Sequence, residues 1–444
     1  MKYHLIILGC QMNMSDGERV RTIIETQTGY QWTDREEEAN LLGILACSVR
    51  QKAIDKVYSR IHKWNKWKNQ RNLITFLSGC VLPDDMEKFL KMFDIIFRMS
   101  ELETFPDMIR QYGVATPVSL APDLTGMPKN ENIDHFWKIT PQYSSSFEAF
   151  IPIQNGCDKF CTFCAVPYTR GREVSRSSDE IMCELQGLID RNYKSITLLG
   201  QNVNSYGLDK KGEEITFPGL LRKIGEYGKS SGKEFWVYFT SPHPRDMTDE
   251  VIEVISQYDC LAKQIHLPIQ SGDDDVLRRM NRKHTVEKYR SIIATVRRLL
   301  PQATIFTDII VGFTGETEEQ FENTRRIMDE FSYNMAYIAQ YSQRPGAVSS
   351  HWVDDVPADV KKNRFHLLGN DLRRHTSAHN SRMIGQVYKV LVTGFDRKEG
   401  YLSALTEGKI VCRFKSADEQ LIGQFVYLRI ISSTYFSVEG ELIL

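Results

Sequence analysis

The sequence predicts an α/β protein of three domains: an N-terminal parallel α/β sheet domain, a central partial (β/α)6 barrel and a C-terminal small antiparallel β-barrel of the OB-like kind. Three observations predict this fold. Residues 1–115 alternate short apolar runs with helical spacing. Residues 147–376 repeat the alternation through six strand–helix units. Residues 380–444 hold five short strand patterns separated by glycine and polar turns.

The N-terminal domain is expected to place cysteines at the ends of its strands. Four strands are predicted, at residues 4–9, 41–46, 73–79 and 94–99, and the first three are followed directly by Cys10, Cys47 and Cys80. Residues 116–146 are rich in Pro, Gly, Ser and Asn and show no periodicity, so we expect a linker there.

The central domain is expected to carry its chemistry at the carboxyl ends of its strands, as (β/α) barrels do. The six predicted strands are residues 149–154, 195–200, 235–241, 262–269, 304–312 and 335–342. A loop with three cysteines follows the first strand, and polar side chains lie at or just beyond the ends of the second and fourth: Gln201, His266, Gln270 and Ser271.

Composition limits the class of protein. The 444 residues carry a formal net charge of −1, so the protein is not globally basic. Any contact with nucleic acid must therefore depend on local basic patches. No apolar run approaches the roughly 20 residues that a bilayer span needs, and the first residues do not resemble a secretory signal. We therefore expect a cytoplasmic protein without membrane contact. In that reducing compartment nine cysteines indicate metal binding or catalysis more readily than disulfides.

The loop cysteines Cys157, Cys161 and Cys164 have C-x3-C-x2-C spacing. Structural zinc takes four ligands, usually from two C-x2-C knuckles. A [4Fe–4S] cube normally takes four cysteines, so three leave one iron open to a substrate. The spacing favours a cluster over zinc and over unligated thiols. Cys183, Cys260 and Cys412 have no partner at ligand spacing and are expected to be structural.

The loop and its surroundings resemble the radical S-adenosylmethionine superfamily, with Phe163 directly before the third cysteine. Further motifs resemble, in order, the methylthiotransferase family. They are GCQMN (9–13), ACSVR (46–50), SGC (78–80), CTFCAVPYTRGREVSR (161–176), LLGQNVNSYG (198–207), HLPIQSGDDDVLRRMNR (266–282), DIIVGFTGETEEQF (308–321) and YSQRPG (341–346). CQMN and LLGQNVNSYG are similar to the tRNA-modifying (MiaB) branch. The C-terminal domain resembles the TRAM domain, an RNA-binding module.

The resemblance implies two [4Fe–4S] clusters and S-adenosylmethionine as cofactors. Cys157, Cys161 and Cys164 would bind the cluster that generates a 5′-deoxyadenosyl radical. Cys10, Cys47 and Cys80 would bind a second, sulfur-donating cluster. Their spacing alone does not mark a metal site, and without the resemblance three buried cysteines acting as small hydrophobes are the favoured alternative. The implied reaction consumes two S-adenosylmethionine molecules. It converts isopentenyl-adenosine at tRNA position 37, next to the anticodon, to its 2-methylthio derivative. No conventional general base is expected.

Other readings stay open at this point. The same chemistry on threonylcarbamoyl-adenosine in tRNA, or on a ribosomal-protein aspartate, would need only a different substrate pocket. A reading from another class is a non-catalytic RNA-binding protein with structural metal. The expected partners of the enzyme are a tRNA anticodon stem-loop and an electron donor such as flavodoxin or ferredoxin, and the chain is expected to be a monomer.

Weaker assignments concern the surroundings of the clusters. Phe163, Gln201, Asn202, Ser271 and Gly312 are expected to contact the cofactor, with core packing as the alternative for Phe163. Arg170 and Arg172 would contact the cofactor carboxylate or a tRNA phosphate, or form a surface salt bridge. Residues 50–71 hold eight Lys/Arg and one acidic residue with Trp64 and Trp67 between them. Lys63, Lys66 and Lys68 of this segment are expected to contact RNA, unless it is simply a solvated amphipathic helix.

The chain departs from the family pattern at three places. Leu45-Ala46 stands where the family usually has Asn-Thr, Thr314 where a proline is usual, and Ala347 where a threonine is common. None of these departures removes a candidate cluster ligand. The first alters the hydrogen bonding around Cys47, and hence the expected potential of the second cluster.

Overall fold

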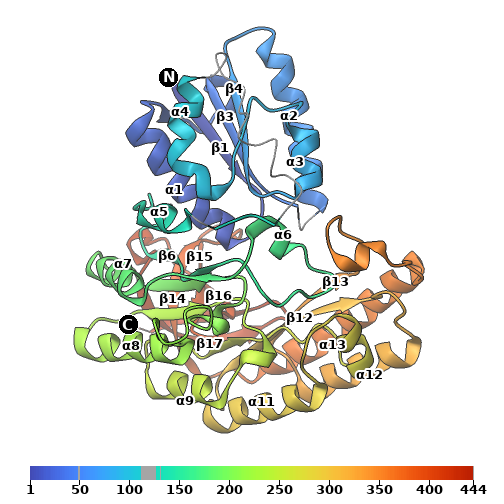
Figure 1. Ribbon diagram of the computed structural model, residues 1–444. Helices are drawn as coiled ribbons and strands as arrows, with labels where there is room; N and C mark the ends of the chain where they lie inside the picture. Colours follow the sequence, from blue (N-terminus) through green and yellow to red (C-terminus); the bar gives the residue numbers. More distant parts are fainter. Residues whose placement is uncertain (49–50, 112–126, 131, 444) are drawn as a thin grey trace.

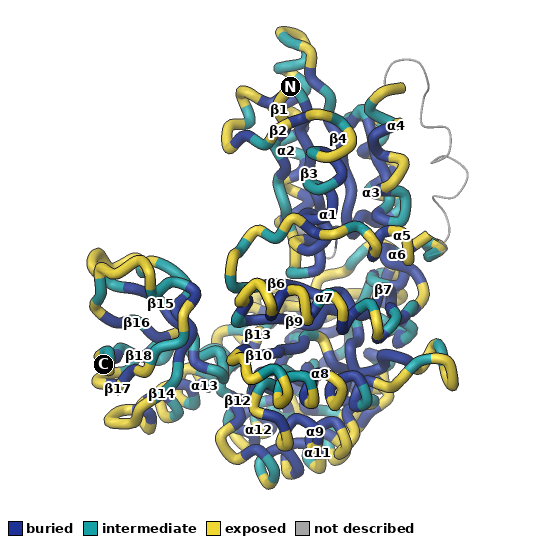
Figure 2. The backbone as a smooth tube through the Cα atoms, turned by 90° about the vertical axis from the view of Figure 1, so that its left-hand side faces the viewer, coloured by how far each residue is buried: buried dark blue, intermediate teal, exposed yellow. Residues whose placement is uncertain are grey.

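The computed structural model describes residues 1–48, 51–111, 127–130 and 132–443, and it has three parts (Figure 1). The N-terminal α/β unit lies above the central barrel, and the C-terminal β-barrel lies behind it in that view. In the perpendicular view the C-terminal barrel stands clear to one side, and the sheet interiors are the buried parts of the chain (Figure 2). No helix in the described ranges has the length and apolarity to cross a membrane.

The N-terminal unit is a five-stranded parallel sheet in the order β2-β1-β3-β4-β5. Its strands are β1 (Lys2–Ile7), β2 (Gln31–Trp32), β3 (Leu41–Cys47), β4 (Ile74–Cys80) and β5 (Ile95–Ile96). Its helices are α1 (Gln11–Gln27), α2 (Gln51–Lys68), α3 (Pro83–Phe89) and α4 (Phe105–Arg110). All four predicted strands are present, and β2 is a two-residue edge strand that the sequence did not reveal. Every residue of β3 is buried, as expected for a parallel strand covered on both faces.

The predicted linker is only partly a linker. Residues 112–126 and 131 lie outside the described residues, but Ile133–Lys138 form a helix, α5. Its side chains Ile133, Phe136 and Trp137 are buried in the core of the N-terminal unit. The linker prediction is wrong for this stretch because three apolar residues on one helical turn suffice to dock it on the neighbouring domain.

The central domain is an open barrel of six parallel strands. It consists of two sheets, β10-β9-β6 and β11-β12-β13, joined by a single bridge between Val237 and Leu261. The strands are β6 (Glu148–Pro152), β9 (Ser195–Leu199), β10 (Trp236–Phe239), β11 (Gln264–His266), β12 (Thr304–Val311) and β13 (Met335–Gln340). The outer helices are α7 (Ser178–Asp190), α8 (Phe217–Ser231), α9 (Asp249–Gln257), α10 (Asp274–Arg279), α11 (Val286–Leu299), α12 (Glu318–Phe331) and α13 (Ala358–Ser381). All six predicted strands are confirmed; β11 is shorter than predicted, and Pro268, just beyond it, lacks the N–H that the ladder needs.

The C-terminal domain is a closed barrel in the order β14-β15-β16-β18-β17. Its strands are β14 (Val387–Phe395), β15 (Tyr401–Thr406), β16 (Val411–Lys415), β17 (Phe425–Ser433) and β18 (Ser437–Ile443). The prediction of a small barrel is confirmed, but it is not purely antiparallel, because β16 and β18 pair in parallel.

The C-terminal barrel docks on the amino-terminal edge of the central strands. Trp236, the first residue of β10, stacks edge-on against Phe425 with ring centroids 4.5 Å apart. Thr304, the first residue of β12, donates its hydroxyl to the carbonyl of Gly408 at 2.8 Å. The cysteine loop follows the opposite, carboxyl end of β6. The two ends of the central barrel are therefore occupied by different parts of the chain.

Candidate functional site

The loop of Cys157, Cys161 and Cys164 follows β6 and the short strand β7 (Gln154–Asn155). Cys157 and Cys161 are buried, and Cys164 is half-buried. The loop begins at Gly156, whose φ is +80°, and a Cβ there would lie 2.0 Å from the carbonyl oxygen of Arg172. Only glycine fits this position, because the backbone after the loop passes directly against it.

Distant residues hold this loop in shape. The amide of Thr162 donates to the carbonyl of Met280 at 3.1 Å, and its hydroxyl donates to the carbonyl of Arg279 at 2.8 Å. The side-chain amide of Asn281 donates to the carbonyl of Phe160 at 2.8 Å. Phe160 itself has a φ of +48°. The C-terminal end of α10 therefore sets the conformation in which the three thiols are presented.

Burial keeps two of the loop thiols in their neutral form. Burial raises the pKa of Cys157 and of Cys164 to about 12. One buried guanidinium is close, since Nη1 of Arg282 lies 3.5 Å from Sγ of Cys161. The two thiols are thus protonated at neutral pH until a metal displaces their protons, as metal ligands require.

The second cysteine group gathers at the carboxyl edge of the N-terminal sheet. Cys47 and Cys80 end β3 and β4 and lie side by side in register, and Cys10 precedes α1. Its thiol is close enough to Cys80 for their charges to interact. Gly79 allows this approach: its φ is +102°, and a Cβ there would lie 2.5 Å from the carbonyl oxygen of Ala46. Adjacent strand ends bring together residues that are about 35 positions apart in the sequence.

Both groups supply thiols, the ligands that [4Fe–4S] cubes take, and each cysteine of such a cube binds its own iron. Each group offers three thiols on neighbouring backbone, and Cys10 is exposed at the rim of the second.

Buried polar atoms beyond the strand ends fit S-adenosylmethionine. Among those without a hydrogen-bond partner in the described part of the chain are Gln201 Oε1, Asn202 Oδ1, His243 Nε2, Gln270 Oε1 and His284 Nε2. Buried polar atoms are nearly always paired, so these indicate a polar ligand. A cofactor with ribose hydroxyls, an amine and a carboxylate offers the missing donors and acceptors. Two of the predicted cofactor residues, Gln201 and Asn202, belong to this set.

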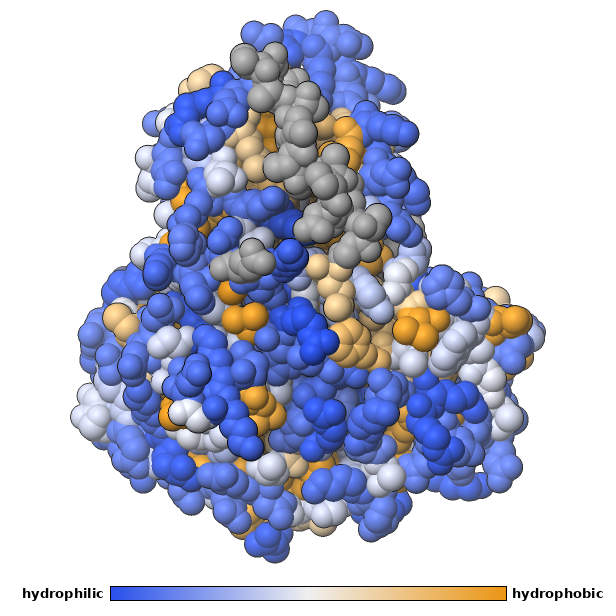
Figure 3. Space-filling view, viewed as in Figure 1, coloured by the Kyte–Doolittle hydropathy of each residue, from blue (hydrophilic) through white to orange (hydrophobic). Residues whose placement is uncertain are grey.

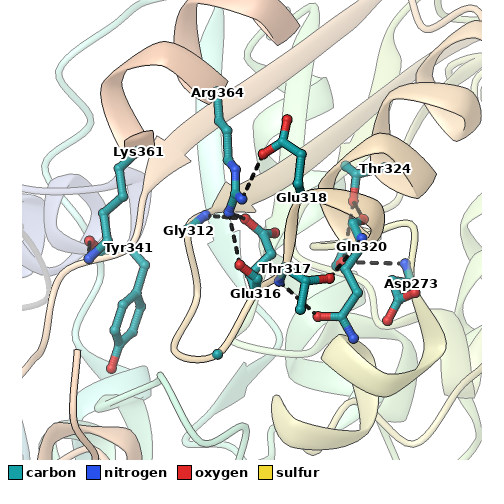
Figure 4. Close-up of polar contacts among 12 residues, drawn as sticks. Asp273, Gly312, Glu316, Thr317, Glu318, Gln320, Thr324, Tyr341, Lys361 and Arg364 are labelled. Atoms are coloured by element: carbon teal, nitrogen blue, oxygen red, sulfur yellow. Dashed lines mark hydrogen bonds and ion pairs between the residues drawn. The ribbon is translucent and has the colours of Figure 1, made fainter. Parts of the chain in front are cut away.

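The other predicted cofactor residues have partners within the protein. Phe163 packs edge-on against Phe313, with ring centroids 6.4 Å apart. The hydroxyl of Ser271 lies 3.4 Å from that of Thr324 on α12. The amide of Gly312 donates to Glu316 at 2.6 Å, and Glu316 also accepts from Arg364 of α13 (Figure 4). The Gly312 turn is thus held by Glu316 and by a helix outside the barrel.

The two arginines after the loop have different surroundings. Arg172 is exposed, and its Nε lies 3.0 Å from Asp158. The side chain of Arg170 is only 5% exposed and is ion-paired with Asp16 of α1 at 2.5 Å. The surface salt bridge considered for these residues describes Arg172, whereas Arg170 lies between the central barrel and the N-terminal unit.

The basic helix α2 is partly neutralised by its own domain. Lys63 lies 3.5 Å from Glu37, and Lys68 lies 2.6 Å from Asp94. Trp64 is fully buried and donates its indole N–H to Glu36 at 3.0 Å, so it is not available for stacking on a base. Lys66 is exposed. Of the three predicted RNA-contacting lysines, two are therefore engaged in ion pairs within the protein.

Sequence reasoning missed a hydrogen-bond contact between a histidine and an aspartate on neighbouring strands of the barrel. His266, at the end of β11, and Asp308, in the middle of β12, lie 2.6 Å apart, and both are partly accessible. Tyr337 of β13 packs edge-on to His266, with ring centroids 5.7 Å apart. The sequence signal for this contact was Asp308, the single acidic residue in the mostly apolar run of β12.

A hydrophilic surface surrounds a more apolar region where the N-terminal unit meets the barrel (Figure 3).

Comparison with known proteins adds three domain matches. Residues 151–328 match the radical SAM superfamily, residues 2–98 match a family described as uncharacterized protein family UPF0004, and residues 381–443 match the TRAM domain.

Two curated relatives are similar along the whole chain. A tRNA-2-methylthio-N(6)-dimethylallyladenosine synthase of Cronobacter sakazakii is 36% identical, covering 100% of this chain and 92% of the relative. One of Clostridium perfringens is 37% identical, covering 98% and 96%. The chain belongs to this synthase family. The family match covers both cysteine groups, and the radical SAM domain of these synthases uses S-adenosylmethionine and a [4Fe–4S] cluster.

Solved structures support the fold alone. The radical S-adenosylmethionine methyltransferase TsrM from Kitasatospora setae, with tryptophan and a cofactor analogue bound, superposes with a TM-score of 0.57. It is 11% identical, and the alignment covers 79% of this chain and 75% of that one. The same enzyme with cobalamin and a [4Fe–4S] cluster gives a TM-score of 0.56 at the same identity, covering 79% and 74%. The synthase family thus shares its core architecture with other radical enzymes.

Proposed function

We propose that this protein is a radical SAM tRNA methylthiotransferase. It converts N6-isopentenyl (dimethylallyl) adenosine at tRNA position 37 to the 2-methylthio derivative. The observation that carries the proposal is the pair of three-cysteine groups, one on the barrel and one on the N-terminal sheet, in a chain that matches such synthases from end to end.

The residues divide the work. Cys157, Cys161 and Cys164 hold one cluster at the barrel mouth, and Cys10, Cys47 and Cys80 hold the other at the edge of the N-terminal sheet. When bound, the clusters and S-adenosylmethionine supply a carbon radical and the sulfur to be inserted. Gln201 and Asn202 orient the cofactor through their unpaired amide oxygens. The buried surroundings of the loop exclude water from the radical.

The substrate is the finer part of the proposal. The target base leaves its stack to reach the barrel, as in other enzymes that act on a base. The TRAM domain and exposed residues such as Lys66 and Arg172 hold the anticodon stem-loop. The protein works in the cytoplasm as a monomer, with a flavodoxin or ferredoxin supplying electrons.

Mass spectrometry of tRNA from a strain with and without this gene tests the substrate. The expected result is loss of the methylthio group from isopentenyl-adenosine alone. Loss from threonylcarbamoyl-adenosine would instead assign the chemistry to another tRNA base. Unchanged tRNA, with loss of the group from a ribosomal-protein aspartate in the ribosomal proteins of the same strains, would assign it to that protein.

Two triple variants test the cysteine assignment in the anaerobic, reconstituted protein. Replacing either cysteine group by alanine is expected to lower the iron content from about eight to about four per chain. The variant without Cys157, Cys161 and Cys164 no longer cleaves S-adenosylmethionine to 5′-deoxyadenosine. The variant without the other three still cleaves it but transfers no sulfur. Cys183→Ala, at an exposed helical cysteine, is the control and keeps all the iron. Zinc without cofactor cleavage would support a binding protein instead.

A further inference from the structure

Arg170 joins the two cysteine groups. It is the last residue of α6 (Val166–Arg170), six positions after Cys164, yet its side chain enters the N-terminal unit. Its Nε lies 2.9 Å from Sγ of Cys80. Its Nη2 lies 2.5 Å from Asp16 and 3.1 Å from Oδ1 of Asn13. A guanidinium anchored beside one cysteine group thus donates to a sulfur of the other.

Burying the ion pair of Arg170 and Asp16 costs free energy, and the guanidinium is directed at particular partners. The side chains of Arg170 and Asp16 are 5% and 0% exposed, and burying two charges costs several kcal/mol per ion before their attraction is counted. A simple domain contact would not need a buried charge, nor an N–H directed at a thiol. Arg172, two residues later, is 61% exposed and points to Asp158 instead.

The charges around Cys80 act in opposite directions. The guanidinium of Arg170 donates to its sulfur, and the carboxylate of Asp16 is bound to the same guanidinium. A nearby positive charge stabilises negative charge that accumulates on the sulfur, and a nearby negative charge destabilises it.

We propose that Arg170 is a positioning residue that sets the reduction potential of the N-terminal cluster, and this inference rests on the proposed function. Hydrogen bonds to ligand sulfurs and nearby positive charge stabilise the more negative, reduced state of an iron–sulfur cluster. Arg170 therefore makes this cluster easier to reduce, and Asp16 limits the effect while holding the guanidinium in place.

The test is a redox titration of the N-terminal cluster followed by electron paramagnetic resonance. The full chain is used with Cys157, Cys161 and Cys164 replaced by alanine, so that only one cluster is present. Arg170→Gln is expected to lower the midpoint potential, because the donor and its charge are lost. Asp16→Asn is expected to raise it, because a nearby negative charge is lost. A merely structural role would not produce shifts of opposite sign.

Further variants keep the test decisive. Arg170→Gln leaves the buried carboxylate of Asp16 without the guanidinium that pairs with it, and the variant protein can lose iron for that reason alone. In that case the double variant Asp16→Asn/Arg170→Gln is measured instead. The double variant is neutral and is expected to fall between the wild type and Arg170→Gln. Arg172→Gln is the matched control and leaves the potential unchanged. Equal potentials in all variants, or shifts of one sign, would overturn the inference while leaving the methylthio product of the wild type untouched. A background protein that assembles no cluster would instead contradict the proposed function.

Discussion

Lys159 and Asp246 form a buried ion pair, with Nζ of the lysine 2.7 Å from Oδ2 of the aspartate. Lys159 lies between the first two cysteines of the loop, and Asp246 lies beyond β10, on the far side of the same strand ends. The aspartate also accepts from the side-chain amide of Asn202 at 3.0 Å. The pair therefore ties the cysteine loop to Asn202, one of the residues proposed to orient the cofactor.

Lys159→Met is expected to destabilise the protein by about 3–5 kcal/mol, because it leaves a buried carboxylate without its partner. The thermal midpoint and the iron retained per chain, measured anaerobically, are both expected to fall. Arg245→Ala removes an exposed partner of the same aspartate and should cost less than about 1 kcal/mol. An unchanged midpoint for Lys159→Met would show that the pair does not hold the loop.

The clamp between Glu316 and Arg364 offers a second test (Figure 4). The two side chains are 1% and 5% exposed, and Nη1 of Arg364 lies 2.7 Å from Glu316. Arg364→Met is expected to lower the free energy of unfolding by about 3–5 kcal/mol and to loosen the Gly312 turn. Hydrogen exchange of the Gly312 amide reports the loosening. Glu318→Gln, at the 67% exposed partner of the same arginine, is the control and should change little. Equal losses in both variants would contradict this account.

Buried His284 predicts a pH dependence. Desolvation, and then the charge of Arg282, lower the pKa of His284 to about 4. An unfolded histidine has a pKa of about 6.5, so below that pH the unfolded chain binds more protons than the folded one. The free energy of unfolding therefore decreases as the pH is lowered. His284 alone accounts for a decrease of about 2 kcal/mol between pH 7 and pH 5.

Urea unfolding at the two pH values measures this effect. His284→Gln is expected to show a smaller loss of stability on acidification than the wild type. His135→Gln, at a 57% exposed histidine, should keep the wild-type dependence. If His284→Gln and the wild type lose the same amount, the ring does not titrate as described.

The close contact between Gly408 and Thr304 attaches the C-terminal barrel to the central domain, and this can be tested. A Cβ at this position would lie 2.5 Å from Cγ2 of Thr304, and the same threonine donates to the Gly408 carbonyl. Gly408→Ala is expected to cost about 1–3 kcal/mol through overpacking and to speed proteolytic release of the C-terminal barrel. Gly369→Ala, in α13 with no atom within 4 Å of the new Cβ, should instead stabilise by about 0.5–1 kcal/mol. Unchanged proteolysis of Gly408→Ala would show that the docking tolerates the methyl group.

The sequence predicted the elements that depend on local pattern. The buried strands β3 and β4 are continuous apolar runs, and their direct continuation into Cys47 and Cys80 was visible in the chain. The same holds for the loop of Cys157, Cys161 and Cys164, whose ligand spacing is local. Short edge strands such as β2 and the parallel pairing of β16 with β18 were missed, because neither leaves a periodic signal.

What only the tertiary structure decided are contacts between distant residues. The basic run of α2 indicated an RNA surface, but Glu36 and Asp94 neutralise part of it after folding. Arg170 reads as one of two neighbouring arginines, yet it pairs with Asp16, 154 positions away. Apolar periodicity and the C-x3-C-x2-C spacing are properties of a few consecutive residues, so the sequence by itself determined the strands, the domains and the local group of Cys157, Cys161 and Cys164, whereas Cys10, Cys47 and Cys80 meet only through the pairing of strands. The partner of a charged side chain depends on which segments pack together, so the tertiary structure alone decided which charges pair with each other and which stay exposed.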